Sequence, residues 1–91
     1  MPADPTEPVT TCRVCGYDWG EPPWGTDGDA STHWICPCCG VQAGYEDSTA
    51  DSSRRYRAAW LARGAPWSDR HEAHDGLTTQ DRLARVPPGF A

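Results

Sequence analysis

Two short cysteine segments hold the residues of this sequence whose types and spacing could do chemistry. Each contains the pattern C-x-x-C-G, at residues 12–16 and again at residues 36–40. Two cysteines three residues apart and followed by glycine favour a tight turn, here called a knuckle, whose backbone N–H groups point at the sulfurs. Two facing knuckles supply four thiolates in a tetrahedron, which suits Zn²⁺ or a single iron ion. We therefore predict one metal site with four ligands: Cys12, Cys15, Cys36 and Cys39.

Disulfides or a thioredoxin-like redox pair are the alternative uses of such cysteine pairs. Residues 1–11 carry three prolines and lack the basic and apolar regions of a signal peptide. We therefore expect a cytoplasmic protein, whose thiols are kept reduced, and this argues against structural disulfides. A thioredoxin-like pair would belong to a βαβ pattern, which the sequence lacks.

The fifth cysteine, Cys38, lies inside the second segment. Its use as a ligand beside Cys36 would give a C-x-C spacing, which does not form the same turn as the first knuckle. We expect Cys38 to be a free thiol packed as a small residue beside the metal. The alternative is a reactive thiol that exchanges as a ligand or senses oxidants.

Composition explains why a metal would matter to this chain. It has 91 residues and a net charge of −5, and Leu, Ile, Val and Phe together number 9. So few aliphatic side chains normally leave a chain disordered, because little apolar surface can be buried. Five cysteines and five tryptophans instead indicate a small domain held by a metal and an indole-rich core. The length excludes a large enzyme, and no apolar run reaches the roughly 20 residues of a membrane span.

The charge balance argues against a nucleic-acid partner. Acidic residues number 13 against 8 arginines, whereas nucleic-acid binding needs a basic face. Four arginines are expected on the solvated face of a helix: Arg54, Arg55, Arg57 and Arg63. We therefore expect any macromolecular partner to be another protein.

We predict a flexible tail at residues 1–11 and a single metal-stapled domain at residues 12–91. In residues 12–47, glycine and proline spread between the cysteines leave room only for short strands. These strands are expected to pair antiparallel, over residues 10–13, 33–35 and 41–43. Residues 48–91 contain no cysteine and are expected to be helical. The fold class is therefore predicted to be α+β.

One main helix and a shorter one are expected in this second part. Residues 52–63 form an apolar stripe at three- and four-residue spacings, made by Tyr56, Ala59 and Trp60. Gly64 suits a left-handed C-cap, and Pro66 prevents the helix from continuing. The shorter helix is expected over residues 80–85.

The tryptophans are expected mainly in the core. Trp34, Trp60 and Trp67 are predicted to cover the metal site. Trp19 and Trp24 lie in the loop between the knuckles, where an exposed indole would suit a protein partner. The alternative is that this loop folds over its own metal site.

Histidine is the other metal-binding residue type in the chain. His33 precedes the second knuckle, but the four cysteines already complete a ligand set. His71 and His74 lie three residues apart, which is not the spacing of helical zinc-peptidase motifs, and we expect them in an exposed loop. With no Ser–His–Asp constellation and no phosphate-binding loop in the sequence, we expect no enzyme.

The motifs resemble those of two groups of proteins. C-x-x-C-G-Y at residues 12–17 and W-I-C-P-x-C-G at residues 34–40 are similar to the knuckles of rubredoxins and zinc ribbons. I-C-P-C-C-G at residues 35–40 and G-Y-E-D at residues 44–47 are closer to the cysteine-rich CPCC proteins of bacteria. The later segments Y-R-x-x-W, G-A-x-W and P-x-x-F also look like that group, so the resemblance covers nearly all of residues 12–91.

The two resemblances imply different things. Similarity to the CPCC group implies metal-ligand roles for the four cysteines and nothing catalytic. Similarity to rubredoxins implies a small rubredoxin-like zinc ribbon of short antiparallel strands, or an iron site in the same place. The loop between the knuckles is shorter than rubredoxins use, and the C-terminal helical half has no counterpart there. These departures weaken the electron-transfer interpretation.

We therefore expect a small non-catalytic module that binds one Zn²⁺ and acts as an accessory or protein-interaction protein. Zinc is favoured over iron because a structural zinc site contributes folding free energy directly, which this chain needs. One alternative is a rubredoxin-like one-electron carrier with one iron held by the four cysteines. Another is a thiol or metal sensor that uses Cys38.

Overall fold

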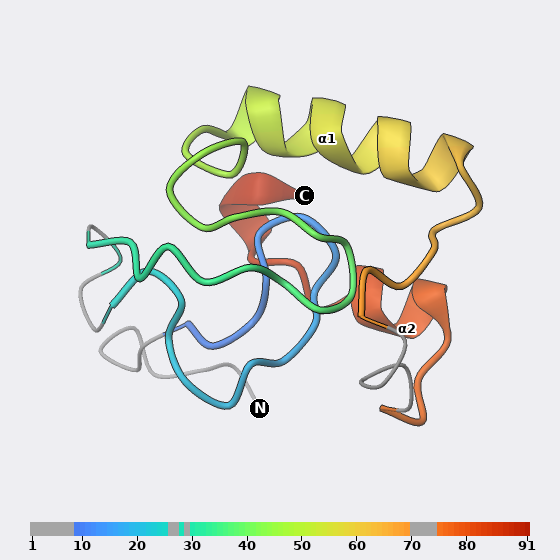
Figure 1. Cartoon of the computed structure of the whole chain (residues 1–91), viewed down its shortest axis with the longest axis horizontal. Helices are drawn as coiled ribbons and strands as arrows, with labels where there is room; N and C mark the ends of the chain where they lie inside the picture. Colours follow the sequence, from blue (N-terminus) through green and yellow to red (C-terminus); the bar gives the residue numbers. More distant parts are fainter. Residues whose placement is uncertain (1–8, 26–27, 29, 70–74) are drawn as a thin grey trace.

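Two α-helices and one 3₁₀ turn are the regular elements of the part of the chain that the structure describes. The computed structural model describes residues 9–25, 28, 30–69 and 75–91. Helix α1 spans Ala50–Ala62, helix α2 spans Thr79–Leu83, and a 3₁₀ turn, η2, spans Pro88–Phe90. In Figure 1, α1 lies along one side of the molecule, and the loops that carry the cysteines lie beneath it. Irregular chain therefore makes up most of the part around the cysteines.

The predicted ribbon of antiparallel strands is wrong, because no strand forms in the described residues. Each knuckle is closed by one isolated antiparallel bridge, between Thr11 and Asp18 or between Ile35 and Gln42. Strand pairing does not continue past these bridges, because residues near them leave the extended backbone conformation. Beyond the second bridge, His33 has a φ of 63° on one side and Gly44 a φ of 99° on the other.

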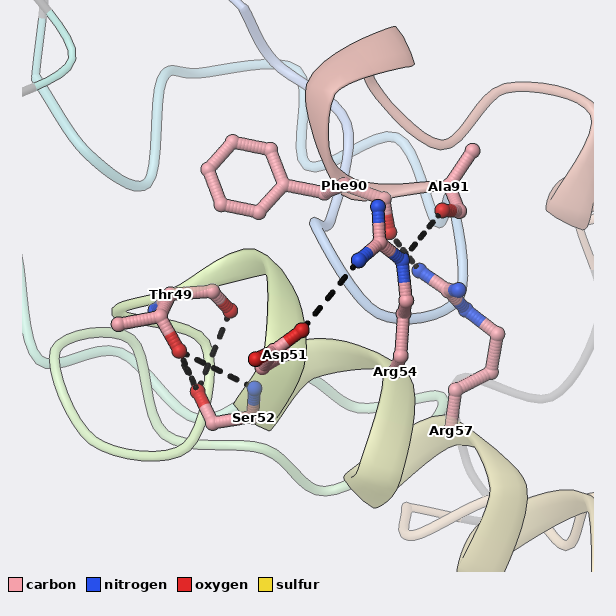
Figure 2. A network of polar contacts seen from close by, with 7 residues as sticks. All are labelled: Thr49, Asp51, Ser52, Arg54, Arg57, Phe90 and Ala91. Atoms are coloured by element: carbon pink, nitrogen blue, oxygen red, sulfur yellow. Dashed lines mark hydrogen bonds and ion pairs between the residues drawn. The ribbon is translucent and has the colours of Figure 1, made fainter.

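Helix α1 begins where side chains satisfy its first free N–H groups. The Ser52 N–H donates to Thr49 Oγ1 at 3.1 Å, and the Thr49 N–H donates to Ser52 Oγ at 3.3 Å. This reciprocal arrangement is a capping box, and Figure 2 shows its side chains. The helix starts two residues before the predicted position and ends one residue earlier, at Ala62.

The C-terminal residues are tied back onto α1, as Figure 2 shows. Arg54 Nε donates to the Ala91 carbonyl oxygen at 2.8 Å, and Arg57 donates to the Phe90 carbonyl oxygen at 2.6 Å. Arg54 also pairs with Asp51 at 3.5 Å, but both side chains are exposed, so this ion pair adds little stability. The turn η2 is thereby packed against the same helix that faces the cysteines.

Helix α2 is short and carries a buried arginine. Its N-cap is Thr78, and the helix starts one residue before the predicted range of 80–85 and ends two residues earlier, at Leu83. Arg82 is 3% exposed and pairs with Asp75 at 2.9 Å while also donating to the Leu77 carbonyl oxygen. Its guanidinium lies 4.8 Å from the centre of the Trp67 ring. These contacts fix α2 against the segment that follows α1.

The core is built around sulfur and one indole. Trp60 is completely buried, and its Nε1 donates to the Pro66 carbonyl oxygen at 2.8 Å. The buried cluster around it contains all five cysteines and two valines, Val14 and Val41. This agrees with the prediction that Trp60 covers the cysteine site. The scarce aliphatic residues therefore leave the cysteines as the centre of the packing.

Candidate metal centre

The first knuckle, residues 12–16, is a tight turn closed by the backbone. The Gly16 N–H donates to the Cys12 carbonyl oxygen at 3.0 Å, and the Val14 N–H approaches Cys12 Sγ at 3.4 Å. Gly16 has a φ of 82°, a conformation that side chains with a Cβ adopt at a cost. The turn thus aims one N–H at a sulfur and brings Cys12 and Cys15 to one side.

The second knuckle, residues 36–40, repeats this geometry. The Gly40 N–H donates to the Cys36 carbonyl oxygen at 2.9 Å, and the Cys36 N–H donates to the Val41 carbonyl oxygen at 2.8 Å. Gly40 has the same φ as Gly16, 82°. The identical C-x-x-C-G spacing therefore produces the same local turn twice, as the sequence predicts.

The two knuckles bring four sulfurs together. Cys12 and Cys39 Sγ are 3.8 Å apart, and Cys15 and Cys36 Sγ are 3.7 Å apart. All four sulfurs lie within 4.8 Å of one another, and all four residues are buried. A tetrahedron with Zn–S bonds of ~2.3 Å has sulfurs about 3.8 Å apart. The group is therefore spaced to hold one tetrahedral metal ion.

The sulfurs of this group form no disulfide. All five cysteines are free, and the two close sulfur pairs are far longer than a disulfide bond of about 2.05 Å. Structural disulfides, one alternative use of the cysteine pairs, are therefore not present in the structure. The prediction that these four cysteines could bind a metal agrees with their arrangement.

Hydrogen bonds among the four thiols favour ionisation of one of them, Cys12. The pKa of Cys12 is well below its ordinary value, because the thiols of Cys15, Cys36 and Cys39 hydrogen-bond to its sulfur. The pKa of Cys15 is raised, first by its hydrogen bond to Cys12. Burial raises the pKa of Cys39. A metal ion would displace the protons of the four thiols, because it binds cysteine in the thiolate form.

Helix α1 holds both knuckles through two adjacent side chains. The Tyr56 hydroxyl donates to the Cys39 carbonyl oxygen at 3.0 Å. Arg57 donates to the carbonyl oxygens of Val14, at 2.6 Å, and Arg13, at 3.0 Å. We expected Arg57 on a solvated face, so sequence reasoning missed its role. No spacing rule reveals it, since its partners lie more than 40 residues away.

We expect Arg57→Lys to lower the free energy of unfolding by about 2 kcal/mol. Arg57 makes three hydrogen bonds, including the one to Phe90, whereas an ammonium group cannot reproduce the planar fork. Chemical denaturation of the metal-loaded protein measures the change. Arg55→Lys is the matched control, because Arg55 is exposed on the same helix and its side chain makes no hydrogen bond to a described residue. An equal loss of stability in both variants would contradict the role of Arg57 in holding the first knuckle.

Cys38 is buried beside the four-sulfur group and is not a member of it. Its carbonyl oxygen accepts the Ser68 N–H at 2.9 Å, which joins the second knuckle to the segment after α1. A hydrogen bond with the Cys15 thiol lowers the pKa of Cys38, and the charge of Arg82 also lowers it. Complete burial fits a packing role better than contact with an external oxidant.

We predict that Cys38→Ala leaves the metal content unchanged, whereas Cys39→Ala weakens metal binding by more than about 100-fold. Cys38 lies outside the group of four, so removal of its thiol costs packing and a hydrogen bond with Cys15 and leaves the four sulfurs of the group in place. Alanine is preferred to serine, because a buried hydroxyl without a partner would add a separate cost. Metal analysis of the purified variants and competition with a chelator measure both effects. Loss of the metal from the Cys38→Ala variant would contradict this prediction, because it would indicate that Cys38 also binds the ion.

The structure places Trp24 in a stack with little free surface. Trp24 Nε1 donates to Asp47 Oδ2 at 2.8 Å. The Arg13 guanidinium lies 3.9 Å from the Trp24 ring centre and 4.3 Å from that of Phe90. Arg13 also donates to the Asp47 carbonyl oxygen at 3.2 Å. Trp24 therefore secures the loop between the knuckles through Asp47 and Arg13.

Trp19 is also half-buried, and its ring stacks on Trp34 with centres 5.5 Å apart. Trp34 itself is 40% exposed, so it covers the site less than we expected. Trp67 packs against the core and meets Tyr17 edge-on at 5.8 Å. His33 is exposed and lies outside the four-sulfur group. His71 and His74 lie outside the described residues, as do residues 1–8 of the predicted tail.

Comparison with known proteins adds no assignment to this geometry. Among the helices of the described residues, none has the length and apolar character needed to cross a membrane. Searches against protein-family models, curated proteins and solved structures found no match.

Proposed function

We propose that this protein is a small non-catalytic module whose fold is held by one Zn²⁺ ion on Cys12, Cys15, Cys36 and Cys39. The observation that carries the proposal is the group of four buried sulfurs within 4.8 Å of one another. Two knuckles with the same turn geometry supply two ligands each. The ion would join segments of chain that are otherwise linked by few apolar contacts.

The donor set supports a structural role for the ion. Four thiolates complete tetrahedral coordination, whereas catalytic zinc sites keep one position open for water or substrate. All four cysteines are at most 3% exposed, so a substrate has no route to the ion through the folded protein. An ion without an open position and without access supports folding and does not carry out catalysis.

Zinc is favoured over iron because the ion must supply folding free energy to a protein with little apolar core. The buried hydrophobic residues include only three valines, two of them beside the cysteines, and no leucine or isoleucine among the described residues. A structural zinc site contributes on the order of 10 kcal/mol of apparent folding free energy in small domains. No observation in the structure favours electron transfer.

Native mass spectrometry of freshly purified protein, combined with metal analysis, tests this proposal. We expect one zinc ion per chain and a colourless solution. A red protein with one iron ion, bleached by reductant, would replace zinc with iron in the same site. Protein that folds with no metal at all would overturn the proposal. The same spectrum reports the oligomeric state.

The role of such a module is to present surface to another protein. Its support is the combination of a rigid centre with exposed apolar side chains next to it, among them Ile35 at 61% and Tyr45 at 61% exposure. Soluble proteins seldom group such side chains without a use for them. We therefore propose an accessory or protein-interaction role, in which the metal fixes the shape of the binding surface.

A further inference from the structure

The peptide group between Arg13 and Val14 in the first knuckle makes a hydrogen bond at each end. Its N–H, which belongs to Val14, donates to Cys12 Sγ at 3.4 Å. Its carbonyl oxygen, which belongs to Arg13, accepts a hydrogen bond from the Arg57 guanidinium at 3.0 Å. The same guanidinium donates to the Val14 carbonyl oxygen at 2.6 Å. A cation and a sulfur of the candidate site therefore lie at opposite ends of one peptide group.

A cation bonded to a peptide oxygen makes the N–H of that peptide a stronger donor. Hydrogen bonds that share one group polarise one another, and bonds with one charged partner are stronger than neutral ones. The bond from Val14 to Cys12 would gain most when the sulfur is a thiolate, which is the form that binds a metal ion. Arg57 is therefore placed to stabilise negative charge on Cys12 without touching its sulfur.

The second knuckle builds the same turn without a cation on its carbonyl oxygens. The equivalent oxygens belong to Pro37 and Cys38, and they accept the backbone N–H groups of Asp69, at 2.8 Å, and Ser68, at 2.9 Å. The glycines that end the two knuckles nevertheless have the same φ of 82°. Neutral donors are thus sufficient to shape such a turn, so the positive charge of Arg57 is not needed for the geometry of the first knuckle.

The charge of Arg57 is not paired with a carboxylate in the described part of the chain. Its three hydrogen bonds go to carbonyl oxygens, and Figure 2 shows the one to Phe90. The ion pairs among the described residues involve Arg54 and Arg82 instead. Burial lowers the pKa of Arg57, and negative charge on three sulfurs of the site raises it: those of Cys12, Cys15 and Cys39. The guanidinium therefore lies within electrostatic reach of the thiolates that a metal would bind.

We propose that Arg57 is a positioning residue of the metal centre, whose positive charge acts through the Arg13–Val14 peptide to stabilise the thiolate of Cys12. A divalent ion on four thiolates leaves about two excess negative charges, and Arg57 would offset part of that excess. The inference rests on the proposed function, because it needs a metal ion on the four cysteines. It gives the charge of Arg57 a role separate from the hydrogen bonds that hold the first knuckle.

Replacement of Arg57 by citrulline, in full-length protein made by chemical synthesis, tests the role of the charge alone. Citrulline has the shape of arginine but is neutral, because an oxygen replaces one terminal nitrogen. Only Nε and Nη2 of Arg57 donate to described residues, so citrulline with its oxygen in the place of Nη1 can keep all three bonds. We expect Arg57→citrulline to weaken zinc binding by about tenfold in competition with a chelator.

An NMR measurement reports on the peptide group itself. In protein loaded with an NMR-active cadmium isotope in place of zinc, an amide proton couples to the metal across an N–H···S bond. We expect this coupling at the Val14 amide of the wild type. Arg57→citrulline should reduce the coupling and move the Val14 proton upfield, because the N–H becomes a weaker donor. A purely structural role of Arg57 would leave both signals unchanged, since the three bonds are kept.

Two further comparisons separate the charge from other effects. Arg55→citrulline is the matched control, because it removes the same charge from an exposed side chain of α1, and it should change zinc affinity by less than about twofold. If Arg57→citrulline does not fold, Arg57→Lys and Arg57→Gln decide the question with the cadmium-loaded protein. Lysine keeps the charge and glutamine does not, so the coupling at Val14 should be larger in Arg57→Lys.

Each outcome decides the inference. It is overturned by unchanged zinc affinity in Arg57→citrulline, by an equal loss in Arg55→citrulline, by equal coupling in Arg57→Lys and Arg57→Gln, or by absence of the coupling at Val14 in the wild type. Zinc content is measured for every protein. One zinc ion bound with unchanged affinity in Arg57→citrulline would reject the role of the charge and leave the metal module standing. A wild-type protein that folds without metal would reject the module itself.

Discussion

Chelation of zinc from the loaded protein is expected to abolish the tertiary structure around both knuckles, residues 12–47. The buried cluster consists of five cysteines, two valines and Trp60, so little apolar area remains once the sulfurs are no longer joined. Loss of about 10 kcal/mol of metal-binding free energy equals or exceeds the total stability of a domain this small.

Circular dichroism and amide NMR spectra before and after addition of a chelator measure this unfolding. Reductant is kept in both samples, so that disulfides cannot substitute for the metal. Re-addition of zinc should restore the dispersed spectrum, which separates metal loss from irreversible damage. Native-like spectra from protein shown by mass spectrometry to be metal-free would contradict the prediction.

Gly16→Ala is expected to destabilise the protein by about 3 kcal/mol or more. A Cβ at this position would overlap the carbonyl oxygen of Arg82 and lie 2.7 Å from its carbonyl carbon. Both are backbone atoms, so no side-chain rotation relieves the overlap. The φ of 82° adds a cost of roughly 1 kcal/mol for any residue with a Cβ. The end of α2 must therefore move away from the first knuckle.

Gly20→Ala is the matched control for this change. Gly20 has a φ of 74°, but nothing lies within 4 Å of a Cβ built there. It should show only the cost of the backbone conformation, roughly 1 kcal/mol. Thermal and chemical denaturation of both zinc-loaded variants compare the two costs. If the two variants lose equal stability, then α2 does not pack on the knuckle as described. Zinc analysis shows whether Gly16→Ala also loosens the site.

The grouping of the four cysteines is the part of the structure that the sequence predicts best. Each knuckle is a local structure, in which a C-x-x-C-G segment and its closing hydrogen bond involve residues at most four apart. The helices were found for a related reason. Caps and apolar stripes act within a few residues, so the main helix could be predicted to within two residues at its start.

The predicted strands are wrong because strand pairing depends on contacts that the local sequence does not specify. Residues 33–35 and 41–43 have the alternation and the side chains of short strands, and Ile35 and Gln42 do form one bridge. The left-handed backbone at His33 then ends the extended segment. Histidine adopts positive φ more often than most residues with a Cβ, but too rarely for the sequence to predict that conformation. It arises in a segment that packs against Gly44, where an added side chain would collide with Ser31.

The contacts that hold the site were also beyond the sequence. Arg57 and Tyr56 are ordinary helix residues until the tertiary structure places them over three carbonyl groups of the knuckles. Arg13 is an unremarkable residue between two cysteines until Trp24 and Phe90 enclose its guanidinium. Such roles depend on which distant segments meet, and no periodicity records that.

The sequence by itself predicts which four cysteines come together, because the spacing of the cysteines and glycines dictates each turn locally. It also shows that few aliphatic side chains are available to build a core. The position of Cys38, buried and outside the group of four, agrees with the prediction from the sequence. Only the tertiary structure decided that the knuckles are joined without strands in the described residues and that Trp34, more than Trp24, reaches the surface. Those outcomes depend on packing between segments that are far apart in the chain, where small differences in fit decide which side chain is buried.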